Sequence, residues 1–210
     1  MYKLYYDSGA ASMAPHAVLQ EIGAPHELVR VDTDKGEHRG AAYTRLNPNA
    51  RVPTLDHDGM IMYESAAICL YLSERHPDAK LMPAVGAPRR GHFLQWLTFL
   101  TNTVQEASMQ WFHPDYYADD AAAQQAVKRH AEAKHDRQWR QIDAALGRDG
   151  PYLLGGEFSA ADIYLAMCVR WTRNMATPAM TYANVKRCAD LVKARPAYRR
   201  MLAVEGIEQP

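Results

Sequence analysis

The sequence has little excess charge of either sign and no long apolar run. Its 24 Lys and Arg residues balance 24 Asp and Glu residues, so the formal net charge at pH 7 is zero. This balance gives no electrostatic reason to expect nucleic acid or an anionic membrane as the main partner. No segment approaches the roughly 18 consecutive apolar residues of a membrane span, and the strand-like start differs from a signal peptide. We therefore expect a cytoplasmic protein that is not bound to a membrane.

Cysteine is also scarce. The three cysteines, Cys69, Cys168 and Cys188, lie far apart in helical patterns. They form no CxxC pair and no zinc-ligand spacing, so we expect buried reduced thiols, no disulfide framework and no metal site.

The pattern of strands and helices changes near residue 80. Residues 1–80 alternate short strands with helices, which predicts a small α/β domain. Residues 76–88 contain three prolines and a glycine without sustained periodicity, as expected of a linker. Residues 89–210 are helical throughout, with long helices expected over 89–111 and 121–146. A capping box at Ser159 and Asp162 is expected to start a later helix.

Residues 47–65 combine a turn, a hairpin and a polar helix start. Val52-Pro53 precedes the first hairpin strand, and a cis bond there would leave the Val52 backbone groups available to a peptide-like ligand. Glu64 and Ser65 stand where the next helix begins, and free N–H groups at such a position bind carboxylates. Together these features predict a site for a peptide that carries a carboxylate.

The order of three motifs resembles that of cytosolic glutathione transferases. VPTL at residues 52–55, followed by ES at 64 and 65, is similar to their glutathione-binding segment. KLYYDSGAASMAPHAVL at 3–19 resembles the first strand and helix of the bacterial, beta-like members, and GEFSAADIYLA at 156–166 resembles a folding motif of their helical domain. The resemblance implies the glutathione transferase fold, with a thioredoxin-like α/β domain over 1–80 and an all-α domain over 89–210.

By this resemblance, the site residues follow position by position. Val52 and Pro53 would meet the cysteinyl unit of glutathione, and Glu64 and Ser65 would hold its γ-glutamyl end. A further contact to the glycyl carboxylate is implied at Lys35, and His38 and Arg51 would assist it. A solvated surface lysine is the alternative for Lys35. A different carboxylate contact or a dimer ion pair is the alternative for Arg51. The electrophile pocket would lie between the domains and be lined by Ala10, Gln105, Met109, Phe112 and His113, with Tyr116 and Tyr117 as further candidates. Ordinary packing is the alternative for each of these.

Catalysis of this kind requires a lower pKa for the glutathione thiol, because the thiolate is the nucleophile. A shift of about two pH units corresponds to roughly 2.7 kcal/mol, which a hydroxyl donor or a helix N-terminus can supply. The beta-like pattern has a cysteine where Ala11 stands, so disulfide chemistry through the protein is not expected. Ser12 is our first candidate for the donor, with a simple helix cap as its alternative, and Tyr6 is the second.

The leading hypothesis is therefore a homodimeric glutathione S-transferase that conjugates glutathione to apolar electrophiles. An isomerase, dehalogenase or ether-cleaving enzyme that uses glutathione as a cofactor is a second possibility. A non-catalytic glutathione-binding protein is a third.

Overall fold

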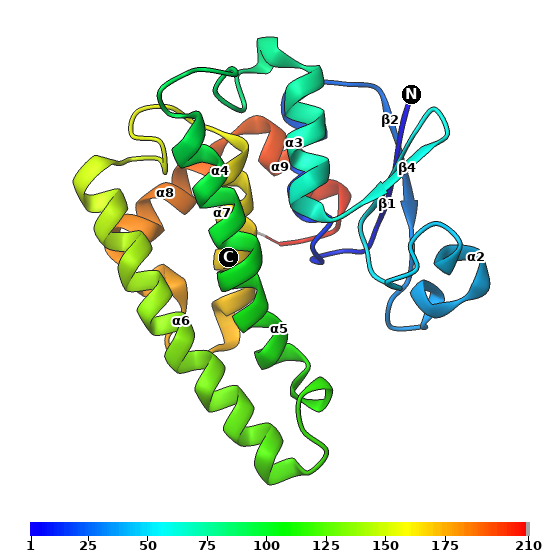
Figure 1. The fold of residues 1–210 in the computed structure, drawn as a ribbon, viewed down its shortest axis with the longest axis vertical. Helices are drawn as coiled ribbons and strands as arrows, with labels where there is room; N and C mark the ends of the chain where they lie inside the picture. The colour runs from blue at the N-terminus through cyan, green and yellow to red at the C-terminus, as the bar shows by residue number, and fades with distance from the viewer. Residues whose placement is uncertain (209–210) are drawn as a thin grey trace. The chain divides into compact units, whose positions relative to one another are not determined.

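The computed structural model describes residues 1–208, which divide into two compact units (Figure 1). The first unit consists of Met1–Met82 together with the segment from Ala194 onward, and the second is Pro83–Lys193. The end of the chain thus packs with its beginning, whereas the sequence predicted one helical domain over 89–210. That predicted boundary stays a prediction.

The first unit is built on a mixed four-stranded sheet in the order β2-β1-β3-β4. Its strands are β1 (Tyr2–Tyr6), β2 (His26–Arg30), β3 (Thr54–His57) and β4 (Met60–Tyr63). β1 runs parallel to β2 and antiparallel to β3, and Leu4 is paired with Leu28 on one side and Leu55 on the other. Leu4 and Leu55 are fully buried, so the centre of the sheet is also the centre of the core.

Three helices of the first unit pack as a group, because α1 (Met13–Ile22) contacts both α3 (Ser65–Arg75) and α9 (Pro196–Val204). The first seven residues of α1 are all buried, which explains its nearly continuous apolar sequence. Arg195 holds Glu21 through two hydrogen bonds of 2.6 and 2.8 Å and ties the start of α9 to α1. The remaining elements are the short helices η1 (Glu37–Arg39), α2 (Ala41–Thr44) and η2 (Pro77–Ala79).

The second unit is helical. Its long helices are α4 (Arg90–Phe99), α5 (Glu106–Phe112), α6 (Ala121–Asp149), α7 (Ala160–Trp171) and α8 (Ala183–Ala194) (Figure 1). Short turns of helix are η4 (Pro114–Tyr116), η5 (Thr172–Asn174) and η6 (Ala179–Thr181). The single helix predicted over 89–111 is interrupted by a π-helical segment, η3 (Leu100–Gln105).

The predicted capping box starts α7. The Asp162 carboxylate accepts from the Ser159 N–H at 2.8 Å, and it also accepts from the Leu153 N–H at 2.8 Å. Burial raises the pKa of this carboxyl to about 6, although these hydrogen bonds oppose the shift.

The three cysteines are free and buried, as predicted, and burial raises the pKa of each thiol. Within residues 1–208 we find no helix long and apolar enough to cross a membrane.

Candidate active site

The segment before β3 exposes backbone groups outside the sheet. The Val52-Pro53 peptide bond is cis, as the sequence predicted, and β3 begins only at Thr54. The preceding carbonyl of Arg51 is already held by the Tyr43 hydroxyl at 2.8 Å and by the Asn47 amide at 2.7 Å. In contrast, the Val52 backbone N–H and C=O have no hydrogen-bond partner within residues 1–208. They are therefore available to an extended ligand.

The start of α3 combines a strained residue with a buried hydroxyl. Glu64 has φ 73° and ψ 107°, a backbone conformation that is costly for any residue except glycine. Its carbonyl accepts from the Ile68 N–H at 2.9 Å, and its own side chain is exposed. The Ser65 hydroxyl donates to the carbonyl of Ala11, in the loop between β1 and α1. This bond connects the helix start, which suits a ligand carboxylate, to the loop where a thiol activator is expected.

Ser12 lies in that loop with its hydroxyl already engaged. Its Oγ donates to the Asp7 carbonyl at 3.0 Å and accepts from the Asp7 N–H at 3.2 Å, and the residue is fully buried. The hydroxyl does not cap its own helix. A hydroxyl has one proton, so Ser12 can donate to a ligand sulfur only if it releases Asp7. Its catalytic role stays a prediction.

The Asp7 carboxylate fixes the other side of the loop. It accepts from the Ser8 N–H at 2.9 Å and from the Thr33 N–H at 3.0 Å. Burial acts to raise the pKa of Asp7, but hydrogen bonds from Thr33, Ser8 and Arg30 outweigh it and hold the pKa below its usual value. The loop is thereby tied to the chain that follows β2.

A buried contact between a histidine and a carboxylate holds the same loop from the segment after α9. Glu205 follows α9, and its Oε1 lies 2.8 Å from Nδ1 of His16 on α1, with both side chains fully buried. Its Oε2 accepts from the Gly9 N–H at 3.0 Å, and its backbone carbonyl accepts from the Ser8 hydroxyl at 2.6 Å. The β1–α1 loop therefore depends on a residue near the end of the chain.

Tyr5 and Tyr6 are neighbours on β1 and point to opposite faces of the sheet, because side chains alternate along a strand. The Tyr5 ring lies 6.1 Å from that of Tyr43, and the Tyr6 ring lies 6.0 Å from that of His16. Tyr6 is half-buried beside α1. The structure thus leaves Tyr6 as a candidate but shows no polar contact that selects it.

The residues predicted for the glycyl carboxylate occupy different environments. Lys35 is exposed and forms an ion pair with Asp32 at 2.9 Å, and the hydrogen bond from this pair raises the pKa of Lys35. Arg51 is exposed, whereas Nδ1 of the half-buried His38 has no hydrogen-bond partner in the described part of the chain. Of these three side chains, His38 therefore has a buried nitrogen atom to offer to a ligand.

The residues predicted for an electrophile pocket belong to both units. Ala10 is half-buried in the loop of the first unit. In the second unit, the carboxamide oxygen of Gln105 accepts from the buried Tyr164 hydroxyl, and the ring of His113 stacks on Tyr116 at 4.9 Å. Met109 is half-buried and Phe112 is exposed. Their role in a pocket stays a prediction.

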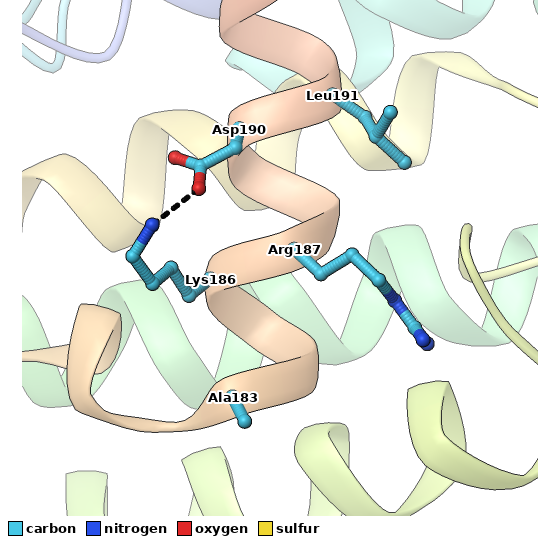
Figure 2. Close-up of a pocket in the computed structure, with 5 residues that line it drawn as sticks. All are labelled: Ala183, Lys186, Arg187, Asp190 and Leu191. Atoms are coloured by element: carbon cyan, nitrogen blue, oxygen red, sulfur yellow. Dashed lines mark hydrogen bonds and ion pairs between the residues drawn. The ribbon is translucent and has the colours of Figure 1, made fainter.

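A surface depression on α8 does not share this chemistry. Figure 2 shows that all its labelled residues come from one helix and that Lys186 and Asp190 pair with each other at 2.5 Å. None of its lining residues was predicted to bind a ligand. We therefore place the candidate site in the first unit, around the starts of α1 and α3.

Two family models match the chain. Residues 2–74 match the glutathione S-transferase N-terminal domain, and residues 122–200 match the glutathione S-transferase C-terminal domain. The chain belongs to the glutathione S-transferase family.

Several relatives and solved structures are similar over nearly the whole chain. The glutathione S-transferase GstA of Escherichia coli O157:H7 is 28% identical, covering 98% of this chain and 100% of its own. The beta-class transferase of Sphingomonas chungbukensis is 30% identical with a TM-score of 0.85, covering 98% and 100%. A sphingomonad transferase complexed with glutathione is 31% identical with a TM-score of 0.85, covering 98% and 100%. A maleylacetoacetate isomerase of Pseudomonas aeruginosa is 29% identical, covering 84% and 81%.

The residues that hold the loop in place could not be found from the sequence. Asp7 and His16 lie inside the first motif, but their partners are fixed only by the fold. Glu205 is an isolated acidic residue after an amphipathic helix, 189 positions from His16. The only local hint was a histidine inside an otherwise apolar helix, and that signal is weak.

Proposed function

We propose that the protein binds glutathione in its first unit and transfers the thiol to an electrophile. The observation that carries this proposal is the hydrogen bond from the Ser65 hydroxyl to the Ala11 carbonyl. It brings the start of α3, where Glu64 and Ser65 suit a γ-glutamyl group, next to the start of α1, where a thiolate would be stabilised. The unpaired backbone of Val52 supports the contact to the cysteinyl unit between them.

For thiol activation, the geometry favours backbone donors. The backbone N–H groups of Ala11 and Ser12 have no acceptor within residues 1–208, and they lie just before the first turn of α1. The start of a helix carries partial positive charge, which favours an anion such as a thiolate. We therefore assign the lowering of the thiol pKa first to these N–H groups. The Ser12 hydroxyl and Tyr6 remain the side-chain candidates.

The other assignments follow from family membership and chemistry. Lys35, His38 and Arg51 are proposed to meet the glycyl carboxylate, because a cation or an unpaired imidazole nitrogen can bind it. The electrophile is proposed to contact Ala10, Gln105, Met109, Phe112 and His113. We propose a cytoplasmic homodimer, which is the arrangement that the family resemblance implies.

A second function is supported by the relatives, since one of them is named as a maleylacetoacetate isomerase. In that case, glutathione would add to the substrate and leave again unchanged, so it would act as a cofactor. Dehalogenation and ether cleavage are further reactions that begin with the same thiolate attack. A protein that binds glutathione without catalysis remains the third possibility.

One pair of measurements separates these functions. Calorimetry would measure glutathione binding, and a conjugation assay with a chloronitroaromatic electrophile would measure transfer. Binding with conjugation supports the transferase. Binding without conjugation, followed by turnover of an unsaturated diacid with no loss of glutathione, indicates the isomerase. Absence of glutathione binding would refute the transferase and the isomerase together.

A further inference from the structure

The core of the second unit contains three buried polar atoms on α6 that have no hydrogen-bond partner within residues 1–208: Nδ1 of His135, Oε1 of Gln138 and Nε1 of Trp139. The exposed fractions of these residues are 2%, 8% and 0%. An unsatisfied buried polar group destabilises the folded state, so three of them within five positions call for a common explanation.

The three side chains lie on one face of the helix, because positions i, i+3 and i+4 are neighbours in an α-helix. Nε2 of His135 lies 3.2 Å from the Ser108 hydroxyl on α5, and Nε2 of Gln138 donates to the Thr103 carbonyl in η3 at 3.1 Å. The rings of His135 and Trp139 are nearly parallel, at 10°, with centroids 6.1 Å apart. Through their partnered nitrogen atoms, His135 and Gln138 therefore contact α5 and η3, respectively.

The hydrogen bonds decide which atoms donate and which accept. The Ser108 hydroxyl lies 3.3 Å from the Val104 carbonyl, which can only accept, so its proton is used there. Both bonds of Ser108 are satisfied only if His135 carries its proton on Nε2. Burial lowers the pKa of His135 to about 4, so the ring is neutral at pH 7 and Nδ1 is an acceptor. The three unpartnered atoms are therefore one donor, on Trp139, and two acceptors, on His135 and Gln138.

We propose that these three side chains bind one internal water molecule. Its oxygen accepts from the Trp139 N–H, and its two protons go to Nδ1 of His135 and Oε1 of Gln138. Buried waters typically make about three hydrogen bonds to otherwise unsatisfied groups, which is the number available here. A cation would be repelled by the indole N–H, and an anion by the two acceptors, so the donor set selects a neutral molecule of this size.

This water would stabilise the π-helical segment η3 indirectly, by fixing the Gln138 side chain that bonds to it. Gln138 uses its amide nitrogen on the Thr103 carbonyl in η3, and the water would hold its amide oxygen. The orientation of the carboxamide is then fixed at both ends. π-Helical segments leave backbone groups in irregular positions, and a fixed side chain can satisfy one of them.

Nuclear magnetic resonance on the wild-type full chain tests the proposal without any substitution. We expect a cross-peak between the indole proton of Trp139 and a long-lived water, together with nitrogen shifts that show the Nε2–H tautomer of His135. Trp111 is the matched control, because its indole N–H already donates to Glu132 at 2.9 Å, and we expect no such cross-peak there. A Trp139 indole without a water contact, or His135 protonated on Nδ1, would overturn the proposal.

A pair of variants adds an independent readout. Gln138→Met keeps the length of the side chain but removes the acceptor, so we expect loss of the Trp139 water cross-peak. Gln125→Met, at an exposed position of the same helix, is expected to leave the cross-peak unchanged. If the cross-peak survived in a folded Gln138→Met protein with its wild-type strength, Gln138 would not hold the water and the proposed site would be wrong. If Gln138→Met did not fold, the Trp139 water cross-peak and the His135 tautomer in the wild-type spectrum would still test the proposal.

Discussion

Removal of the Glu205 carboxylate is expected to destabilise the first unit strongly. The carboxylate is fully buried and accepts from Nδ1 of His16 at 2.8 Å and from the Gly9 N–H at 3.0 Å. Glu205→Ala takes away both bonds but keeps the backbone carbonyl that accepts from the Ser8 hydroxyl. The substitution therefore isolates the contribution of the side chain.

The expected loss can be worked out from these contacts. A hydrogen bond to a charged group contributes about 1.5–3 kcal/mol, and Glu205→Ala removes two such bonds to the carboxylate. We expect the free energy of unfolding to fall by about 3–5 kcal/mol. With a urea dependence of about 3 kcal/mol per molar, the midpoint would fall by about 1–2 M. Glu205→Gln keeps one acceptor and should lie between the wild type and Glu205→Ala.

Urea unfolding followed by circular dichroism measures this loss. Glu208→Ala is the matched control, because Glu208 is exposed and only three positions further along the chain. A double-mutant cycle with His16→Ala should give a coupling energy of at least about 1 kcal/mol, since the two side chains are in direct contact. If the free energy of unfolding of Glu205→Ala lay within about 1 kcal/mol of the wild-type value, the contact between Glu205 and His16 would not be what holds the loop.

Three other perturbations test the site and the fold. Ser12→Ala should leave the pKa of the bound glutathione thiol unchanged in an ultraviolet titration, because the Ser12 proton is used within the loop; a rise of about two pH units would show instead that the hydroxyl donates to sulfur. Ser65→Ala removes the hydroxyl that donates to the Ala11 carbonyl and ties the starts of α1 and α3 together, so it should weaken glutathione binding by about 1–3 kcal/mol in calorimetry. Glu64→Gly should weaken it similarly yet stabilise the fold by about 1 kcal/mol, because glycine relieves the strain at φ 73°; unchanged affinity in both variants would remove the site. The pKa of Asp162 is raised to about 6 from its ordinary 3.8, so its protonated form favours folding below about pH 4 and this stability is lost as the pH rises through 6. Relative to Asp162→Asn, the wild type should lose about 2 kcal/mol of unfolding free energy between pH 4 and pH 7 in urea unfolding, and parallel pH profiles of the two proteins would contradict the raised pKa.

Local signals predicted much of the first unit. The hairpin follows from His57-Asp58-Gly59, and the turn places Asp58 at φ 52° and Gly59 at φ 90°, which Asp-Gly adopts readily. The helix start expected at Glu64 and Ser65 is confirmed, since α3 begins at Ser65, where an apolar face directly follows a polar start. In each case the information lies within a few neighbouring residues.

Features set by distant contacts could not be predicted. The π-helical segment inside 89–111 has no proline or glycine to mark it, and its Thr103 carbonyl bonds to Gln138 from another helix. The grouping of α9 with the first unit depends on contacts such as Arg195 with Glu21, 174 positions away. The loop bond of the Ser12 hydroxyl could not be predicted for a similar reason, because a helix cap and a ligand donor, the two roles expected from the sequence, require the same residue.

The loop between β1 and α1 accounts for how the proposed thiol activation would work with alanine at position 11. Two ties from other elements hold the loop, Glu205 through Gly9 and Ser65 through the Ala11 carbonyl, and the bond between Ser12 and Asp7 braces it internally. A loop fixed in this way presents its backbone N–H groups in set directions, and these directions do not depend on the side chain at position 11. Replacement of a cysteine there by alanine removes any mixed disulfide with glutathione, because no sulfur remains to form it. The backbone donors are retained, so under the proposed function they would still stabilise the thiolate for attack on an electrophile.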